Sequence, residues 1–145
     1  MTTDLGYVES CACHKVRMAA RAVTRAYDDA LRPARLRASQ LAVLVAISNN
    51  DGAISITALA KIMGMDRSTL TRNLRPLEKE GLVTVGLEGW RRSRSLSLTE
   101  KGKTVLASAV PLWEGAQKRL KKQLGADQWS LMQSTFENLI ETTSG

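Results

Sequence analysis

The sequence has 145 residues, of which 43% are hydrophobic and 24% charged, a composition that excludes wholesale disorder and fits one globular domain. The formal net charge is +7, and such a basic balance suits a polyanionic partner. The longest apolar run, Leu41 to Ile47, is too short to cross a membrane, and the N-terminus lacks a basic and then apolar signal pattern.

The first predicted helix spans Cys11 to Leu31. Small and apolar residues recur there with the spacing of a helical stripe, Ser10 is placed to cap the N-terminus, and Pro33 ends the helix. The only two cysteines of the chain, Cys11 and Cys13, lie too close together for a disulfide that would join distant segments of the fold. This indicates free thiols in a reducing compartment. We therefore expect a cytoplasmic protein.

Two shorter helices are predicted next. The first is apolar and runs from about 39 to 48, and residues 49–52, Asn-Asn-Asp-Gly, predict a turn. The second begins after Ser55 as its N-cap and ends at Gly64. Its inward-facing residues are expected to be Ile56, Leu59, Ala60 and Met63.

The next helix is predicted from Arg67 to about Glu80, with Asp66 as its N-cap and Gly81 after its end. Three leucines at helical spacing form its buried side, namely Leu70, Leu74 and Leu77. Polar residues fill the outer face: Arg67, Ser68, Thr69, Thr71, Arg72, Asn73 and Arg75. Pro76 is expected to kink or loosen the last turns of this helix.

A β-hairpin and two long helices complete the predicted elements. Short strands at 82–85 and 94–98 flank a basic, turn-rich loop at 86–93. Thr99 caps a helix that runs through Leu120, and Gly125 precedes a last helix. The apolar stripe of that last helix consists of Trp129, Met132, Phe136, Leu139 and Ile140.

The order of these elements predicts a mainly α fold with a small β-hairpin wing (α+β), a winged helix-turn-helix. The basic surplus lies here, since Lys61 to Lys103 holds ten Lys or Arg against five acids. A B-DNA major groove admits one helix, whose N-terminal half reaches base edges while neighbouring side chains contact phosphates. We therefore expect the outer face of the 67–80 helix to read DNA, and Arg91, Arg92 and Arg94 at the hairpin tip to contact phosphates or the minor groove.

Two other functional classes compete with the DNA-binding interpretation. A winged helix can also serve as a protein-interaction module without sequence-specific DNA binding, although the arginines on the helix and wing argue against this. The sequence has no phosphate loop, nucleophile elbow or zinc-protease helix, and its single histidine supplies acid-base chemistry poorly. We therefore expect neither an enzyme nor a cofactor.

The stretch LAKIMGMDRSTLTRNLRPLEKEGLV, followed by a basic hairpin and SLTEKGKTVL, resembles the MarR family of bacterial regulators. The resemblance implies one MarR-like domain over 1–145, with dimerisation helices at 10–32 and 100–145 around a DNA-binding lobe at 37–99. It also implies a homodimer on a pseudo-palindromic operator, usually a repressor, released by a small molecule or by oxidation. The wing departs from the family pattern, because LEGWRR places Trp90 where the family usually has aspartate.

The two cysteines fall in the predicted first turn of the first helix, where free amides and the positive end of the helix dipole favour a thiolate. The spacing from Cys13 to Tyr27 and the segment from Pro33 to Gln40 are similar to those of the OhrR group of organic-peroxide sensors. That resemblance implies that Cys13 is the oxidised residue and that Tyr27 hydrogen-bonds it across a dimer interface. Two further tyrosines of that group correspond here to Arg17 and Ala38.

Other readings of this segment stay open. Both cysteines could be packing residues, since free Cys behaves as a small apolar filler. A metal-responsive regulator could use Cys11, Cys13 and His14, with further ligands from a symmetry-related chain. If both cysteines are helical, their side chains point in different directions and do not readily close an unstrained disulfide within one chain.

A small, anionic, often aromatic ligand is the alternative trigger to oxidation. It would bind in the cleft between the dimerisation helices and the DNA-binding lobe. The residues that combine aromatic faces or cations at this boundary are Arg17, Arg21, Tyr27 and Trp113.

Overall fold

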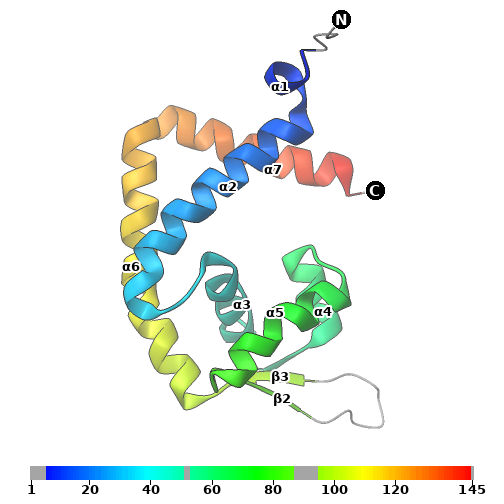
Figure 1. The fold of residues 1–145 in the computed structure, drawn as a ribbon, viewed down its shortest axis with the longest axis vertical. Helices are drawn as coiled ribbons and strands as arrows, with labels where there is room; N and C mark the ends of the chain where they lie inside the picture. Colours follow the sequence, from blue (N-terminus) through cyan, green and yellow to red (C-terminus); the bar gives the residue numbers. More distant parts are fainter. Residues whose placement is uncertain (1–5, 51–52, 87–94, 145) are drawn as a thin grey trace, which may run out of the picture.

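A computed structural model describes residues 6–50, 53–86 and 95–144. Its helices α1 (Tyr7–Ser10), α2 (Ala12–Leu31) and α7 (Ala126–Thr143) occupy one end of the molecule (Figure 1). At the other end lie α3 (Ala38–Ser48), α4 (Ile56–Met63), α5 (Arg67–Lys79) and the sheet. The long α6 (Glu100–Leu124) joins the two ends. This arrangement confirms the mainly helical winged helix-turn-helix fold.

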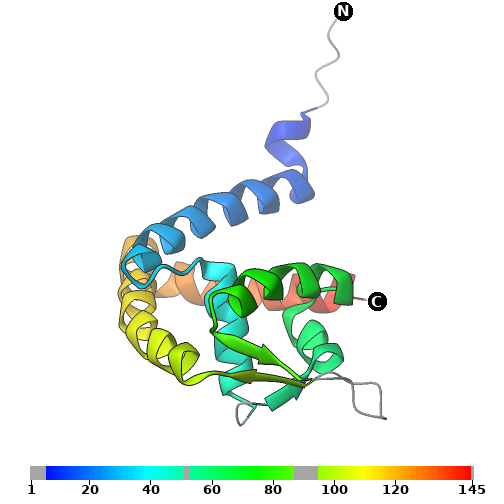
Figure 2. The same ribbon diagram turned by 60° about the horizontal axis from the view of Figure 1, so that its bottom comes forward.

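The sheet has three antiparallel strands in the order β1-β3-β2 (Figure 2). Strand β2 (Val83–Val85) pairs with β3 (Ser95–Leu98) as the predicted hairpin, with Val83 opposite Leu98. Strand β1 (Ala53–Ser55) was not predicted, and it adds to the other edge of β3. A strand of three residues directly before a helix is too short to show an alternating pattern in the sequence.

The core of the described residues lies in the lobe formed by α3, α4, α5 and the sheet. Its largest fully buried side chains include Leu44 and Ile47 of α3, Leu59 of α4, Leu70 of α5 and Leu96 of β3. Leu74 and Leu77 are buried as predicted, as are Ile56, Leu59 and Ala60, while Met63 is half-buried. The apolar stripes of three short helices thus close over one face of the sheet.

Side-chain caps start the helices of this lobe at the predicted residues. The oxygens of Ser55, Asp66 and Thr99 accept hydrogen bonds from the backbone N–H groups of Ala58, Thr69 and Gly102. Gly64, with φ of 64°, ends α4 in the left-handed conformation that glycine adopts without strain. Helix α5 continues through Pro76 to Lys79.

The prediction for the N-terminal helix was wrong at its start. Ser10 does not cap it, because Ser10 is the last residue of α1 and its hydroxyl donates to the Gly6 carbonyl at 2.6 Å. Cys11 separates α1 from α2 with φ of −70° and ψ of 114°, so it lies in extended backbone outside either helix. The prediction that both cysteines lie within one helix is therefore corrected, and only Cys13 is helical.

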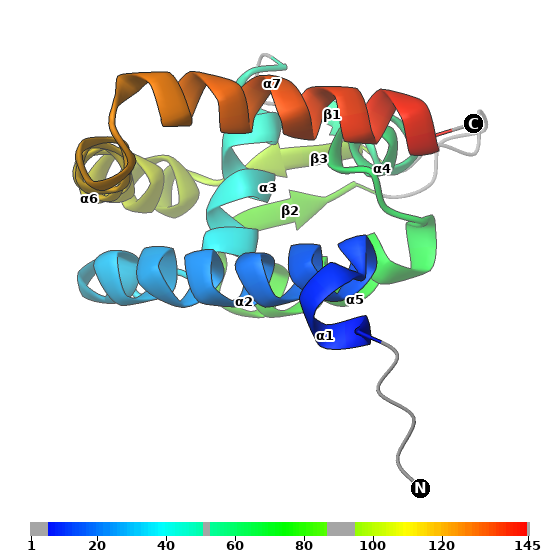
Figure 3. The same cartoon turned by 90° about the horizontal axis from the view of Figure 1, so that it is seen from above.

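Helices α2 and α7 bury little within one chain. Among their described residues, α2 buries Leu31 alone and α7 buries none. Seen from above, the two helices run on either side of α3, with the start of α2 and the end of α7 on the side opposite α6 (Figure 3). Large apolar side chains are exposed on them, including Val16, Met18, Leu131, Phe136 and Ile140. No helix among the described residues is long and apolar enough to span a membrane.

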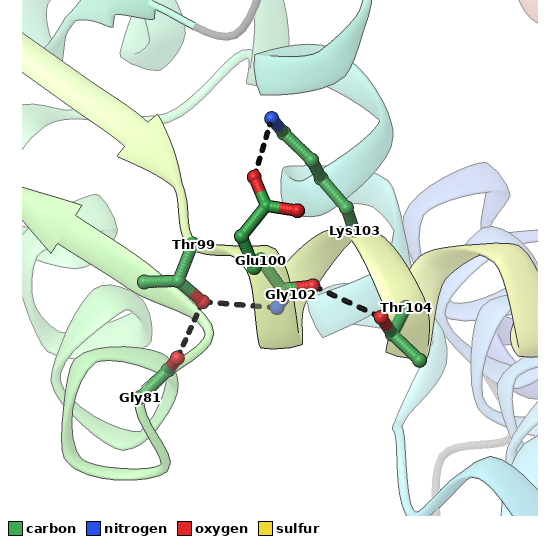
Figure 4. A network of polar contacts seen from close by, with 6 residues as sticks. All are labelled: Gly81, Thr99, Glu100, Gly102, Lys103 and Thr104. Atoms are coloured by element: carbon green, nitrogen blue, oxygen red, sulfur yellow. Dashed lines mark hydrogen bonds and ion pairs between the residues drawn. The ribbon is translucent and has the colours of Figure 1, made fainter.

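The start of α6 is fixed to the lobe by a close backbone contact. The Thr99 hydroxyl donates to the Gly81 carbonyl at 2.6 Å while it accepts from Gly102 N–H at 2.9 Å (Figure 4). A Cβ placed on Gly102 would lie 2.1 Å from the Leu82 carbonyl oxygen. Only glycine therefore lets α6 approach the turn that connects α5 to β2.

We expect Gly102→Ala to destabilise the protein by about 2 kcal/mol or more, because a backbone oxygen cannot move aside as a flexible side chain does. Gly115→Ala, also within α6, is the matched control, because its Cβ would meet only the end of the Arg119 side chain at 3.4 Å. Alanine there should stabilise the helix by about 0.5 to 1 kcal/mol. Urea unfolding followed by circular dichroism measures both, and equal effects at the two glycines would contradict the packing assigned to Gly102.

Candidate functional site

Asp66 organises the N-terminus of α5. Its carboxylate accepts hydrogen bonds from Thr69 N–H and from the Ser68 hydroxyl, each at 2.7 Å. The bond from the Thr69 backbone, supported by Ser68 and the Thr69 side chain, lowers the pKa of Asp66 from 3.8 to about 2. The first turn is thereby held in one conformation, with its remaining polar groups directed away from the core.

The outer face of α5 carries the residues predicted to contact DNA. Arg67, Ser68, Arg72 and Arg75 are exposed, whereas Thr69, Thr71 and Asn73 are half-buried. Some of their polar groups have partners within the chain, since the Thr71 hydroxyl donates to the Arg67 carbonyl at 2.8 Å. Ser68, Arg72 and Arg75 lie on the side of α5 opposite its buried leucines, and the other four residues flank them. We call these seven residues the α5 face.

Arg91, Arg92, Arg94 and Trp90 lie outside the described residues. The strands on either side of them contact the helices of the lobe. Strand β2 packs against α5, and β3 packs against α6. The roles predicted for these three arginines remain predictions.

Cys11 lies in a small polar cluster at the break between α1 and α2. Hydrogen bonding from the backbone N–H of His14, and after it from the Tyr7 hydroxyl and the backbone N–H of Cys13, lowers the pKa of the Cys11 thiol, whereas burial opposes this shift. The Tyr7 and His14 rings lie 5.7 Å apart between centroids. We call Tyr7, Cys11, Cys13 and His14 the thiol cluster.

The two cysteines of the cluster differ in exposure. Cys11 is half-buried and the pKa of its thiol is lowered, whereas Cys13 is exposed. No three His, Cys, Asp or Glu side chains of the described residues are arranged to hold a metal ion, so Cys11, Cys13 and His14 form no such site within one chain. The sequence signal for Tyr7 was its position one helical turn before Cys11.

An apolar pocket of about 560 Å³ lies between α2, α3, α4 and α6. Of the four residues expected at a ligand cleft, Tyr27 and Trp113 line this pocket, whereas Arg17 and Arg21 do not. Its other walls are apolar or small, with Leu41, Val45 and Met63 among them, and only Asn49 and Asn50 add side-chain amides. The Tyr27 hydroxyl donates to Gln117 Oε1, which ties α2 to α6 beside this pocket.

A helix-turn-helix whose second helix exposes a basic face beside an antiparallel sheet defines a winged-helix DNA-binding regulator. The chain belongs to the MarR family, whose family model matches residues 36–85. The M. tuberculosis transcriptional regulator MosR, solved in complex with DNA, is similar to it at 38% identity and a TM-score of 0.84, covering 93% of this chain and 97% of MosR.

Two relatives from Escherichia coli are also similar. The transcriptional regulator HosA of strain O127:H6 is 29% identical over 104 residues, or 71% of this chain and 76% of HosA. A MarR mutant solved with operator DNA is 23% identical with a TM-score of 0.81, covering 95% of this chain and 99% of MarR, which shows the shared fold. The chain is thus a MarR-family DNA-binding transcriptional regulator.

The low pKa of Asp66 predicts an acid-dependent loss of stability. A carboxyl whose pKa is lowered in the folded state stabilises the protein fully above its unfolded pKa, and this contribution disappears as the pH falls through the folded value. The stability difference between wild type and Asp66→Ala should therefore be constant near neutrality and shrink as the pH falls from about 4 to about 2.

Urea unfolding across this pH range measures the difference, and Asp66→Asn is the control because asparagine caps a helix without titrating. The Asn variant should keep most of the stability at neutral pH and lack the acid-dependent part. A difference that stays constant down to the acid limit would contradict the role given to the carboxylate.

Proposed function

We propose that the chain is a homodimeric repressor that binds a pseudo-palindromic operator with the α5 face in the major groove. The observation that carries this is the α5 face, a basic surface held in place by the Asp66 cap and unused by the core. The DNA complex of MosR supports the same use of this lobe. The N-terminal half of α5 reads base edges, and the flanking arginines contact phosphates.

Each group on the proposed interface has a role set by its chemistry. Arg67, Arg72 and Arg75 reach guanine edges or phosphates as bidentate donors. Ser68, Thr69, Thr71 and Asn73 contribute short polar contacts. Arg91, Arg92 and Arg94 of the wing add phosphate or minor-groove contacts whose strength falls with salt.

Homodimerisation follows from the unburied helices at the other end of the molecule. Isolated helices of 20 and 18 residues gain little stability from hydrogen bonds alone and need an apolar face to pack against. In α7, Leu131 is 59% exposed and Ile140 63% exposed within one chain. A second copy that packs against α2 and α7 removes this surface from water and places two α5 helices on successive major grooves, about 34 Å apart.

Thiol oxidation is the favoured signal for release, and the attacking group is Cys11 rather than the predicted Cys13. The Cys11 thiolate attacks the distal oxygen of an organic hydroperoxide. The O–O bond breaks, the sulfur becomes a sulfenic acid, and the remaining alkoxide takes a proton from water to leave as an alcohol. The added oxygen changes the polar surroundings of Cys11 at the break between α1 and α2.

A small ligand is the second candidate signal, supported by the apolar pocket. The residues that line it include no Lys, Arg or His, so an uncharged aromatic ligand suits it better than the anion expected from the sequence. The ligand would separate α2 and α6 from the lobe and so alter the spacing of the two α5 helices.

Arg72→Ala should weaken operator binding by about fivefold or more and reduce the salt dependence of binding, because an exposed guanidinium on the α5 face is lost. Fluorescence anisotropy with an operator fragment over a range of salt concentrations measures both effects. Arg119→Ala on α6 is the matched control and should bind like wild type. Unchanged affinity and salt slope in Arg72→Ala would favour the protein-interaction alternative.

Treatment with cumene hydroperoxide should abolish operator binding by wild type and leave Cys11→Ser unaffected. Tyr7→Phe should oxidise more slowly, since its hydroxyl no longer stabilises the thiolate. If Cys13→Ser alone resists, then Cys13 is the sensor, as the sequence predicted. If wild type keeps its operator affinity after oxidation, the thiol switch is wrong and the apolar pocket becomes the favoured site of the signal.

A further inference from the structure

The hydroxyl groups on the α5 face are already bonded within the chain. The Ser68 hydroxyl donates to Asp66 Oδ1 at 2.7 Å, and the Thr71 hydroxyl donates to the Arg67 carbonyl at 2.8 Å. The Thr69 side chain also hydrogen-bonds the Asp66 carboxylate. A hydroxyl has a single proton to donate and lone pairs with which it accepts. What these groups still offer to a partner is therefore their lone pairs.

The state of the Asp66 carboxylate fixes the direction of its bond with Ser68. The backbone N–H of Thr69, followed by the side chains of Ser68 and Thr69, lowers the pKa of Asp66 to about 2, and Asp66 is therefore ionised near neutral pH. Since an ionised carboxylate only accepts hydrogen bonds, the proton between the two groups belongs to Ser68. A hydrogen bond to an ionised acceptor is also stronger than one between neutral groups. Ser68 thus presents an acceptor, and no donor, on its outer side.

Ser68 lies where a recognition helix comes closest to the bases. It is exposed, it is the second residue of α5, and it lies on the side of the helix opposite the buried Leu70 and Leu74. Side chains in the N-terminal half of such a helix reach the base edges. Arg72 follows one helical turn later on the same side and brings several N–H donors. Within the proposed interface, an acceptor therefore lies beside a strong donor.

An acceptor in the major groove distinguishes two classes of base. Adenine and cytosine each present an amino donor there, at N6 and N4, whereas the hydrogen-bonding groups of guanine and thymine in this groove are all acceptors. Phosphate oxygens are acceptors as well. The Ser68 lone pairs are attracted to an amino group and repelled by a carbonyl or phosphate oxygen, and the negative charge of Asp66 adds to this repulsion.

We propose that Ser68, held by Asp66, is a specificity-determining residue that selects adenine or cytosine at one position of each operator half-site. This inference rests on the proposed function, since it assigns one base contact within the α5 face. Asp66 is a positioning residue that acts by holding the Ser68 proton. In the major groove, every base pair presents an amino group on one strand and a carbonyl on the other. The contacted strand therefore prefers A or C over G or T at that position.

Selection from a library of random double-stranded DNA tests this inference with the full-length protein. We expect wild type to enrich A or C over G or T by about fivefold at one position of each half-site. Ser68→Ala should lose the preference at that position and keep the preferences at the others, whereas Ser68→Thr should retain it because threonine keeps the hydroxyl. Asp66→Gly should also relax that position alone, since glycine caps a helix at little cost and leaves the Ser68 proton free for carbonyl bases. A merely structural role of Asp66 would weaken every position together.

A modified fragment of the selected sequence tests the amino group itself. Replacing the selected adenine by purine, or the selected cytosine by 2-pyrimidinone, removes this group and leaves the ring. Fluorescence anisotropy should show that the replacement weakens binding by wild type about fivefold more than binding by Ser68→Ala. Equal losses in the two proteins would show that Ser68 does not contact the amino group.

The inference is also wrong if Ser68→Ala leaves every base preference unchanged, or if the position that it alters prefers G or T in wild type. Either result leaves the proposed function standing. If Ser68→Ala relaxes the position and Asp66→Gly does not, the role of Asp66 is wrong and that of Ser68 stands. If folded wild type, checked by circular dichroism, enriches no sequence at all, the proposed function fails and this inference fails with it.

Discussion

The contact between Gly102 and the Leu82 carbonyl determines how the two ends of this molecule are connected. Helix α6 is the long element between the lobe and the helices α2 and α7, and its first turn is bound to the turn after α5 through Thr99 and Gly81. A side chain at position 102 would push α6 away from that turn. The orientation of α5 relative to α2 and α7 therefore depends on the few residues that form this contact.

The distribution of burial divides the chain by function. The lobe closes its own core and needs no partner to bury Leu44, Leu70 or Leu96. Helices α2 and α7 leave their apolar faces in water, so their stability in solution depends on what covers them. The exposed apolar surface and the polar α5 face thus lie in different parts of the chain, which α6 joins.

The features predicted correctly from the sequence are mostly local. The caps at Ser55, Asp66 and Thr99 and the turn at Gly64 need only neighbouring residues, and the leucines of α5 follow one helical period. The break at Cys11 was missed because the residues on both sides favour a helix, and β1 was missed because its pairing with β3 joins distant segments. Similarly, Arg25 and Lys101 are far apart in the sequence, and only the fold places them along one groove. The sequence alone also could not separate the side of α2 that carries Arg17 and Arg21 from the side that lines the apolar pocket.

Helix α2 is one continuous element between the thiol cluster at its start and the junction with α3 at its end. It starts beside Cys11 and ends at Leu31, and its 20 residues form a rod about 30 Å long. A rotation of about 5° about one end displaces the other by about 2.6 Å, close to the length of a hydrogen bond. A change in geometry too small to unfold the first turn of α2 is thus amplified at its far end into a shift large enough to break polar contacts there.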